Sequence, residues 1–406
     1  MARARLTLLA CALACAASPA GALAGVDRDQ STDLISTTPD GELPDGESTN
    51  AVISSDKRYA RVIAYESVAT NIVRGDTNGH KDVFLVRREG PVDNSGDEWT
   101  AGRTTLVSKG RRGRPANGDS FSPAVDGSFH TAPSCVGFLS DASNLVARDT
   151  NGETDAFVAR IKGGAIRRVS LPRGKQSKAD TTAIAVSGDC KLVAFVTGGR
   201  LYVSVNGGRP KRLLGKHAAD PSFSTGTRHD LVYGADRGVY LAEDGTRRPE
   251  LVAPGGRNPV YNDIKRQVVA YEKQRDGHTQ VFFHDLGRGE QVASARGGHL
   301  GNGDSRNPVI GNSGYYISFE SDATNLGVNS LSRIGDFNRR PDAYLYTNVR
   351  DITLVQSVFE KAVPLAGGGY NPSMSFYANY ILFDSPAPVG SVDAPHQVWM
   401  RYLGEV

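Results

Sequence analysis

Two kinds of short strand alternate along the chain, and this repeat limits the fold more than any other feature. The first kind carries an aromatic residue near its end, in VIAYES, CVGFLS, LVAFVT, DLVYGA, VVAYEK, YISFES and YILFDS. The second kind follows each of these and has an aromatic at its third position, in DVFLVRR, DAFVARI, RLYVSVN, GVYLAED, QVFFHDL, DAYLYTN and QVWMRYL. Short alternating runs bounded by Gly, Asn, Asp and Pro predict an all-β chain made from one repeated unit.

Each unit contains four strands. A short strand opened by proline precedes most pairs, as in NPVYND and NPVIGN, and a fourth follows most of them, as in TTLVS and IRRVS. Four antiparallel strands repeated seven times predict a seven-bladed β-propeller, in which each blade buries its faces against its neighbours. The aromatic residues are expected to lie between blades; they are Tyr65, Phe84, Phe138, Phe157, Phe195, Tyr202, Tyr233, Tyr240, Tyr271, Phe282, Phe319, Tyr344, Phe383 and Trp399.

The two ends of the sequence predict how the ring closes. The chain stops soon after QVWMRYL, the third strand of the seventh unit, and TDLIS near the N-terminus resembles the outer strand TTLVS. An open ring would leave two exposed sheet edges. We therefore expect a strand at about residues 32–36 to complete the seventh blade, within an N-terminal segment of residues 25–47 that precedes a propeller of residues 48–406.

The first 24 residues have the pattern of a secretory signal peptide. Arg3 and Arg5 precede an apolar run from Leu6 to Ala17, and Ala22-Leu23-Ala24 gives a small-x-small cleavage pattern. A lipoprotein anchor at Cys11 or Cys15, each of which follows an alanine, is the alternative. No other segment approaches 18 apolar residues, so we expect a secreted or periplasmic protein without a transmembrane segment.

Removal of this segment leaves two cysteines, Cys135 and Cys190. An even count in an oxidising compartment favours a disulfide, and two buried free thiols are the alternative. Loss of Arg3 and Arg5 also lowers the formal net charge from +3 to +1. This charge gives no reason to expect a nucleic-acid partner.

The units SSDKRYARVIAYESVATNIVRGDTNGHKDVFLV and SGDCKLVAF resemble the TolB-like, WD-repeat-like propeller repeats of secreted bacterial proteins, and the resemblance covers nearly the whole mature chain. It implies the propeller fold rather than a function. The chain departs from TolB itself, which has a separate α/β domain ahead of six blades. In peptidases of the prolyl oligopeptidase type a hydrolase domain follows a similar propeller; we expect none here, since the seventh unit ends the sequence.

The candidate binding surface is formed by the loops between second and third strands, which share one face with the links between blades. The aromatic spacing ranges from 7 residues (Phe195 to Tyr202) to 25 (Phe319 to Tyr344), and the long loops belong to blades 6, 7, 1 and 2. We call these four loops the crown, and propose a protein or carbohydrate ligand for it; the alternative is that the long loops only pack on one another. Its candidate binding residues are Glu66, Asn71, Asn144, Glu272, Glu320, Asn325 and Asp384.

Four of these residues, Glu66, Glu272, Glu320 and Asp384, directly follow the aromatic of their second strand. Four acids at one rim can bind a cation or a basic ligand. Alternatively, they cap turns or pair with the abundant arginines.

The crown also holds the one candidate metal motif. DTNGHKDVF contains Asp76, Asn78 and Asp82, and the related DTNGETDAF contains Asp149, Asn151 and Asp155. These oxygen ligands make calcium the candidate ion, although an EF-hand loop has a further carboxylate and a later glycine. The alternative is a shaped tight turn, because Asn-Gly accepts positive φ.

The sequence contains no catalytic motif: there is no G-x-S-x-G, H-E-x-x-H, P-loop or C-x-x-C. We therefore predict a monomeric binding or interaction module that needs no cofactor. The alternative is a hydrolase or lyase acting on a polysaccharide or peptide at the central channel. Such an enzyme would bring together two or three of His130, His229, His278, Glu272 and Glu320.

Overall fold

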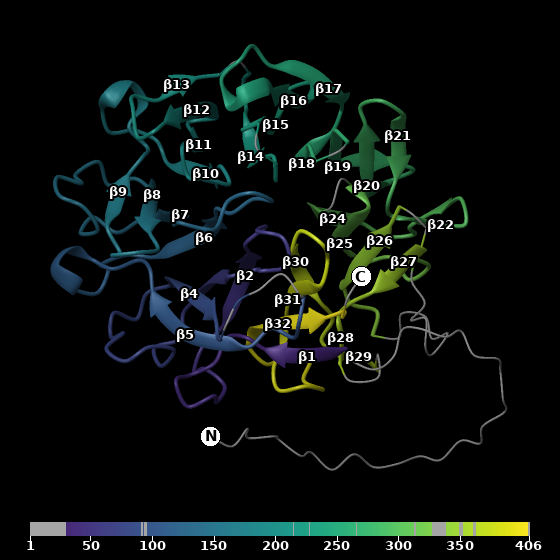
Figure 1. Cartoon of the computed structure of the whole chain (residues 1–406), viewed down its shortest axis with the longest axis horizontal. Coiled ribbons are helices and arrows are strands. Elements are labelled where there is room, and N and C mark those ends of the chain that lie inside the picture. Colours follow the sequence, from purple (N-terminus) through teal and green to yellow (C-terminus); the bar gives the residue numbers. More distant parts are fainter. Residues whose placement is uncertain are drawn as a thin grey trace.

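The computed structural model describes residues 30–404 except 91, 93–95, 214, 227, 265, 312–313, 327–337, 349–351 and 360–362. The predicted signal peptide, with Cys11 and Cys15, lies outside the described residues. Across the described part, seven four-stranded antiparallel sheets follow one another around a ring, as predicted (Figure 1). Within it, no helix has the length and apolar character needed to cross a membrane.

The strands of each blade run outward from the centre in chain order. Blades 1 to 3 contain β2 (Ser48–Ile53), β3 (Val62–Ser67), β4 (Asp82–Arg88), β5 (Ala101–Leu106), β6 (Ser120–Val125), β7 (Cys135–Ser140), β8 (Asp155–Arg160), β9 (Ile166–Arg168), β10 (Thr181–Val186), β11 (Leu192–Thr197), β12 (Arg200–Val205) and β13 (Lys211–Arg212).

Blades 4 to 7 continue the pattern, with β1 as the outer strand of blade 7. Their strands are β14 (Ala219–Phe223), β15 (Leu231–Ala235), β16 (Gly238–Ala242), β17 (Glu250–Pro254), β18 (Arg257–Asn262), β19 (Val268–Arg275), β20 (His278–Asp285), β21 (Gly289–Val292), β24 (Ser305–Gly311), β25 (Tyr316–Ser321), β26 (Asp342–Thr347), β27 (Ile352–Val355), β30 (Tyr370–Met374), β31 (Tyr380–Pro386), β32 (His396–Tyr402) and β1 (Ser31–Leu34).

Short elements lie in the connections. The hairpins are β22 (Ala295–Arg296) with β23 (His299–Leu300) and β28 (Val358–Phe359) with β29 (Val363–Pro364), and the 3-10 helices are η1 (Arg111–Gly113), η2 (Pro172–Gly174) and η3 (Glu243–Gly245).

The predicted aromatic residues pack between blades. In six blades the two aromatics stand opposite each other on the second and third strands and stack with ring centroids 5.5–6.1 Å apart. Each pair joins an apolar cluster with the preceding blade; Phe138 and Phe157, for example, pack with Val62 and Leu85 of blade 1. The middle strands are covered on both faces, which explains why their apolar runs are nearly continuous.

The N-terminal strand closes the ring, as predicted. Strand β1 pairs antiparallel with β32, and Leu34 stands opposite Trp399 (Figure 1). Ile35 continues this pairing by donating a backbone hydrogen bond to Val398 O and is 2% exposed between blades 7 and 1. The pairing covers the edge of β32 that would otherwise be open.

A serine lock fixes the same point of five blades. In each of these blades the hydroxyl of the serine after the fourth strand donates to the side chain of a residue at or near the start of the third strand. The same hydroxyl accepts the backbone N–H of the residue that comes next in the third strand. The pairs are Ser108 with Asp82, Ser170 with Asp155, Ser294 with Gln280, Ser357 with Asp342, and Ser36 with Gln397. Ser36 shows that the N-terminal strand replaces a fourth strand in side-chain detail as well as in backbone pairing.

Candidate binding site at the central channel

The innermost strands of six blades bend at a residue with left-handed backbone. The hydrogen-bond register of each strand shifts there, which marks a β-bulge. Short polar side chains tolerate this conformation better than most. The bulge residues are Asn50, Ser122, Asp220, Asn258, Asn307 and Asn371, with φ between 47° and 54°.

A carboxylate of one blade accepts a hydrogen bond from the bulge N–H of the next blade. We call these contacts the carboxylate clasps. They join Glu66 to Ser122 N (2.7 Å), Glu272 to Asn307 N (2.9 Å), Glu320 to Asn371 N (2.9 Å) and Asp384 to Asn50 N (2.9 Å). In blade 4 the Asp220 carboxylate is hydrogen-bonded by the backbone of Asn258. The clasps therefore link blade 4 through blades 5, 6, 7 and 1 to blade 2.

Three of the clasp carboxylates are neutralised by a cation of their own blade. Lys81 Nζ lies 3.0 Å from Glu66, Arg257 Nε 3.1 Å from Glu272, and Arg306 Nε 2.8 Å from Glu320. Each clasp acid also accepts a hydrogen bond from the side-chain amide of the bulge asparagine in its own blade. These asparagines are Asn50, Asn258, Asn307 and Asn371. The result is a hydrogen-bonded polar belt around the upper part of the channel.

Asp384 is the exception in this belt. It is fully buried, and its Oδ1 has no hydrogen-bond partner among the described residues. Burial, with smaller contributions from the negative charges of Glu66 and Glu320, raises the pKa of the Asp384 carboxyl to about 8. Asp384 therefore keeps its proton to a higher pH than an exposed aspartate does.

Asp384→Asn is expected to remove a pH dependence of stability. Because the folded-state pKa exceeds the unfolded value of about 4, the wild type loses stability as pH rises from about 4 to about 8. Relative to the variant, it should lose roughly 1 kcal/mol between pH 7 and pH 9. Urea unfolding at a series of pH values measures this difference, and a difference between the two proteins that stays constant with pH would contradict the assignment.

A cavity of about 430 Å³ opens beside the belt at the centre of blades 4, 5 and 6. The eight residues that line it are all polar or charged: Asp220, Arg257, Asn258, Glu272, Thr279, Asp304, Arg306 and Asn307. Arg257 spans part of the wall, since Nη2 donates to Thr279 Oγ1 at 3.1 Å. Arg306 is held against Asp322 as well as Glu320. Its lining comes from the first strands β14, β18 and β24, from β19 and β20 of blade 5, and from the link before β24, so the cavity lies where blades 4, 5 and 6 meet.

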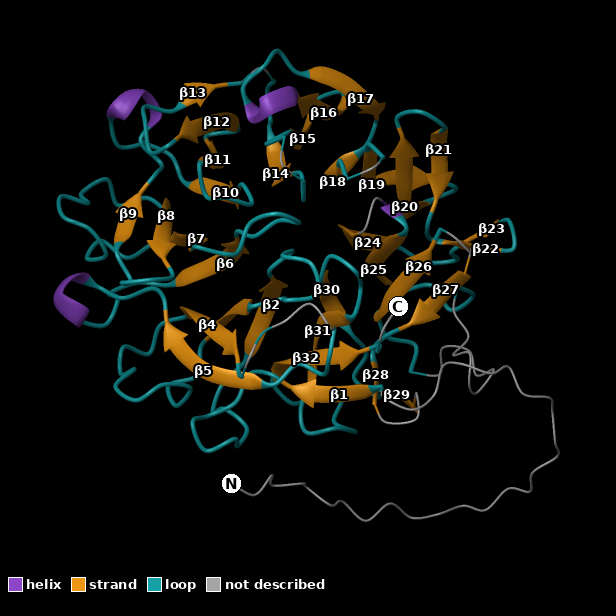
Figure 2. Cartoon of the chain, in the orientation of Figure 1, coloured by secondary structure: helices purple, strands orange, loops and turns teal. Residues whose placement is uncertain are grey.

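A loop of blade 2 reaches towards the ring axis on the lower face. The loop between β6 and β7 carries Phe129, whose ring lies 5.2 Å from that of Phe376 in blade 7 and under Lys57 of blade 1. Phe129 N also donates to Thr225 O of blade 4 at 3.2 Å. Contacts with blades on opposite sides of the ring require the loop to cross the axis (Figure 2). We call residues 127–133 the plug loop; through Phe129 it contacts blades 7, 1 and 4 on the lower face.

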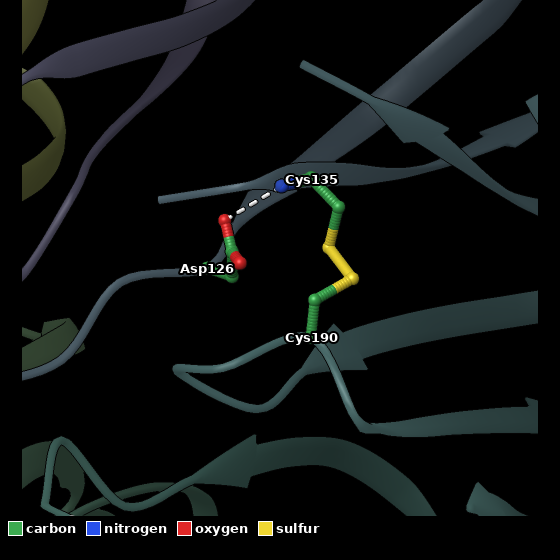
Figure 3. Close-up of side chains that lie close together, drawn as sticks. All are labelled: Asp126, Cys135 and Cys190. Carbon is green, nitrogen blue, oxygen red and sulfur yellow. Dashed lines mark hydrogen bonds between the residues drawn. A yellow bond between two sulfur atoms is a disulfide. The ribbon is translucent and has the colours of Figure 1, made fainter. Parts of the chain in front are cut away.

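The base of the plug loop is fastened by a carboxylate and a disulfide (Figure 3). Asp126 accepts from Ser134 N, Ser134 Oγ and Cys135 N, and burial raises its pKa to about 6. The predicted disulfide joins Cys135 of blade 2 to Cys190 of blade 3. Asp126 and the two sulfurs lie within 4.8 Å of one another, but disulfide sulfurs are not thiolate ligands.

The three crown asparagines hold the chain entering their own blades. Asn71, Asn144 and Asn325 each accept a backbone hydrogen bond from the segment before the first strand, from Asp45 N (3.0 Å), Asn117 N (3.2 Å) and Asn302 N (3.0 Å). Asn144 and Asn325 also donate to carbonyl groups of the same segments. Their amides shape the crown in three blades in the same way.

The two acidic loops differ in what neutralises them. In blade 2, Arg168 Nη1 lies 2.6 Å from Asp149 and 3.0 Å from Asp155, while Asn151 Nδ2 donates to Asp155. In blade 1, Asn78 Nδ2 donates to Asp82 at 2.6 Å, and no described cation pairs with Asp76 or Asp82. Burial raises the pKa of both Asp76 and Asp82, the latter to about 6.

Comparison with known proteins places the chain by fold. No family model matches the sequence, and neither does any curated protein. An oligogalacturonate lyase in complex with manganese superposes with a TM-score of 0.53 at 10% identity, covering 93% of this chain and 97% of that one. The β-propeller domain of the trilobed protease from Pyrococcus furiosus gives 0.52 at 8% identity, covering 88% and 94%. The chain shares their propeller fold.

The resemblance to TolB is weaker in three dimensions. TolB from Acinetobacter baumannii superposes with a TM-score of 0.39 at 13% identity, covering 70% of this chain and 81% of that one. At such identities a likeness shows architecture and leaves activity open.

The structure brings some predicted site residues together and separates others. Glu66, Glu272, Glu320 and Asp384 lie in the belt, and Glu272 also lines the cavity. Asn71, Asn144 and Asn325 lie further out, in the crown. The sequence argument missed Asp220, the two arginines and the two asparagines of the cavity wall. The signal for the last four was the repeated tripeptide Arg-Asn-Pro, at 257–259 and 306–308.

The histidines considered for an enzyme do not converge. His130 is in the plug loop, and His229 pairs with Asp189 at 2.9 Å across lower-face turns of blades 4 and 3. His278 lies 3.6 Å from Asp304, which lines the cavity, and it is the one candidate histidine near the upper channel.

Proposed function

We propose that this propeller is a binding module that takes a carbohydrate into the channel cavity between blades 4, 5 and 6. The polar wall of that cavity carries the proposal, because all eight lining residues offer hydrogen-bond donors or acceptors. Sugar hydroxyls donate and accept at the same time, so they match a wall where guanidinium and amide donors alternate with carboxylate acceptors. The volume of about 430 Å³ lies within the usual range for small-molecule sites.

The shape of the channel supports an end-on ligand. We propose that the plug loop restricts the lower end, so that a ligand enters from the face that carries the crown. The clasp acids lie in the later half of the second strands, on the side of the loops that lead to the third strands, so the cavity and the crown share that face. We propose that the long loops of blades 6, 7, 1 and 2 form a wall on one side of the entrance, and that the ligand approaches over the shorter loops of blades 3 to 5.

The chemistry of the wall favours binding over proton transfer. Glu272 accepts from Arg257, Asn258 and Asn307 N. These three donors occupy the carboxylate and fix its position, so we propose that it serves as an oriented acceptor in the wall. The predicted signal peptide supports action outside the cytoplasm, where extracellular or envelope polysaccharides are the available ligands.

Arg257→Ala is expected to weaken carbohydrate binding at least tenfold. Its guanidinium is 59% exposed and lines the cavity, so truncation removes ligand contacts with little effect on the core. Arg247, 65% exposed and paired with Glu243 next to the η3 turn, provides the matched control Arg247→Ala. A panel of neutral and acidic oligosaccharides, followed by calorimetry on each hit, measures the affinities. Failure of the wild type to bind any oligosaccharide, or equal affinity of Arg257→Ala and the wild type, would refute the proposal.

A further inference from the structure

Blades 1 and 2 contain the same acidic loop, but only blade 2 supplies a cation to it. The guanidinium of Arg168 bonds to both Asp149 and Asp155 through the single atom Nη1. All three side chains are at most 8% exposed, so the charge pair is buried. Removal of either partner from such a pair would leave an uncompensated buried charge, which is costly.

Blade 1 has a neutral residue at the position of that arginine. Arg168 stands opposite Phe157 in the pairing of β9 with β8, and Leu106 stands opposite Phe84 in the pairing of β5 with β4. The loop residues match as well, with Asp76 and Asp82 in place of Asp149 and Asp155. The two carboxylates have therefore been kept while their internal cation has been replaced by leucine.

One carboxylate oxygen of blade 1 is left without a partner. Asp76 is 6% exposed, and its Oδ1 accepts no hydrogen bond from any described residue. The oxygens of Asp82 accept from Ser108 and Asn78 but from no cation. A buried carboxylate oxygen without a donor or a cation is costly. The unpartnered atom has the same position in the loop as Asp149 Oδ1, which Arg168 contacts in blade 2.

We propose that blade 1 binds a divalent metal ion, with calcium as the expected species, between Asp76 and Asp82 at the place that Arg168 Nη1 occupies in blade 2. A cavity of about 770 Å³ reaches the site, since Asp76 and Leu106 both line it. This cavity gives an ion a path to the carboxylates and leaves room for water molecules. Calcium takes six to eight oxygen ligands, so water completes a shell that two carboxylates begin.

Other side chains limit the affinity of the site. Arg74, Arg103, Lys109 and Arg114 line the same cavity, and all four are exposed. Their positive charge opposes a cation, although solvent screens exposed charges strongly. We therefore expect a dissociation constant of ~10⁻⁴–10⁻³ M, the range of extracellular calcium modules.

A reciprocal exchange between the blades tests the site. Calcium chloride is titrated by calorimetry into the chelator-treated full mature chain, and the wild type is expected to bind one ion. Leu106→Arg provides blade 1 with the arginine of blade 2 and should abolish the binding. Arg168→Leu should create a second site, so that two ions bind. Absence of calcium binding by the wild type, or undiminished binding by Leu106→Arg, would overturn the proposal.

Isosteric variants test the site without changing side-chain size. Asp76→Asn is expected to weaken calcium binding more than tenfold, and Asp149→Asn, its counterpart in blade 2, should leave the affinity unchanged. Melting temperatures with 0 and 10 mM calcium provide an independent measurement, because a ligand that binds only the native state raises the melting temperature. The calcium-induced rise should be absent in Asp76→Asn; an equal rise in Asp76→Asn and the wild type would exclude this location.

Discussion

Deletion of the mature N-terminus through Ser36 is expected to lower the melting temperature by more than about 5 °C. The deletion removes β1 and therefore the complete pairing of blade 7 with the N-terminal strand. It also removes Ile35 from the core between blades 7 and 1, and a buried isoleucine alone contributes about 2–5 kcal/mol. In a mature chain of about 380 residues, an unfolding entropy of about 2.1 cal/mol/K per residue makes each kcal/mol shift the melting temperature by roughly 1–1.5 °C. Scanning calorimetry of the two chains measures the difference.

Point variants within the closing strand provide the controls for this deletion. Ile35→Ala should cause part of the destabilisation, and Ser36→Ala should break the serine lock to Gln397. Asp33 lies on the same strand but is exposed, so Asp33→Ala should leave the melting temperature within about 1–2 °C of the wild type. If the deleted chain unfolds at the wild-type temperature, the closure does not stabilise the ring.

The fold could be predicted because every blade repeats the same two physical requirements. The aromatic residues of the second and third strands fill the space between blades, so they recur at fixed places in the sequence. A serine after the fourth strand bonds to the third strand through its side chain, and TDLIS contains that serine as Ser36. The closing strand could therefore be recognised from a five-residue sequence, although more than 360 residues separate it from its partner strand. It was predicted at about residues 32–36, and the structure has it at Ser31–Leu34.

The site was less predictable because its partners are not in the same blade. The repeated position of Glu66, Glu272, Glu320 and Asp384 was visible, but each carboxylate binds a backbone N–H of the next blade. That N–H is available only because the bulge residue adopts positive φ, and no side-chain pattern within one blade reports this. The plug loop was invisible for a similar reason, since Phe129 gains its position from the geometry of the closed ring.

The acidic loops illustrate the same limit at smaller scale. The loop sequences alone could not distinguish a calcium site from a tight turn. Blades 1 and 2 both contain Asp-Thr-Asn-Gly followed by Asp-x-Phe. The deciding residue is on the neighbouring outer strand, where blade 2 has Arg168 and blade 1 has Leu106. Strand register, which requires the folded sheet, shows that the two positions correspond.

The distribution of the clasps indicates where the ring is weakest. In blades 2 and 3 the residue after the second-strand aromatic is apolar, Leu139 or Val196, and the described residues show no clasp from blade 2 to 3 or from 3 to 4. Other contacts hold these junctions on the lower face. The disulfide joins blades 2 and 3, and His229 pairs with Asp189 between blades 4 and 3.

Replacement of both Cys135 and Cys190 by alanine is expected to cost about 4 kcal/mol of unfolding free energy. The bond closes a loop with a sequence separation of 55, and constraint of the unfolded chain by a loop of that size gives roughly this value. Urea denaturation of the oxidised wild type and the double variant measures the cost.

The same variant should also show where the ring opens. Because no clasp supports the junction of blades 2 and 3, loss of the disulfide should raise amide hydrogen exchange first in β10 and in the plug loop, while blades 5 to 7, joined by clasps, keep their protection. A reducing agent should reproduce this pattern in the wild type and leave the double variant unchanged. Uniform acceleration around the ring would instead mean that the clasps do not control local opening, and that the disulfide stabilises all blades equally through the unfolded state.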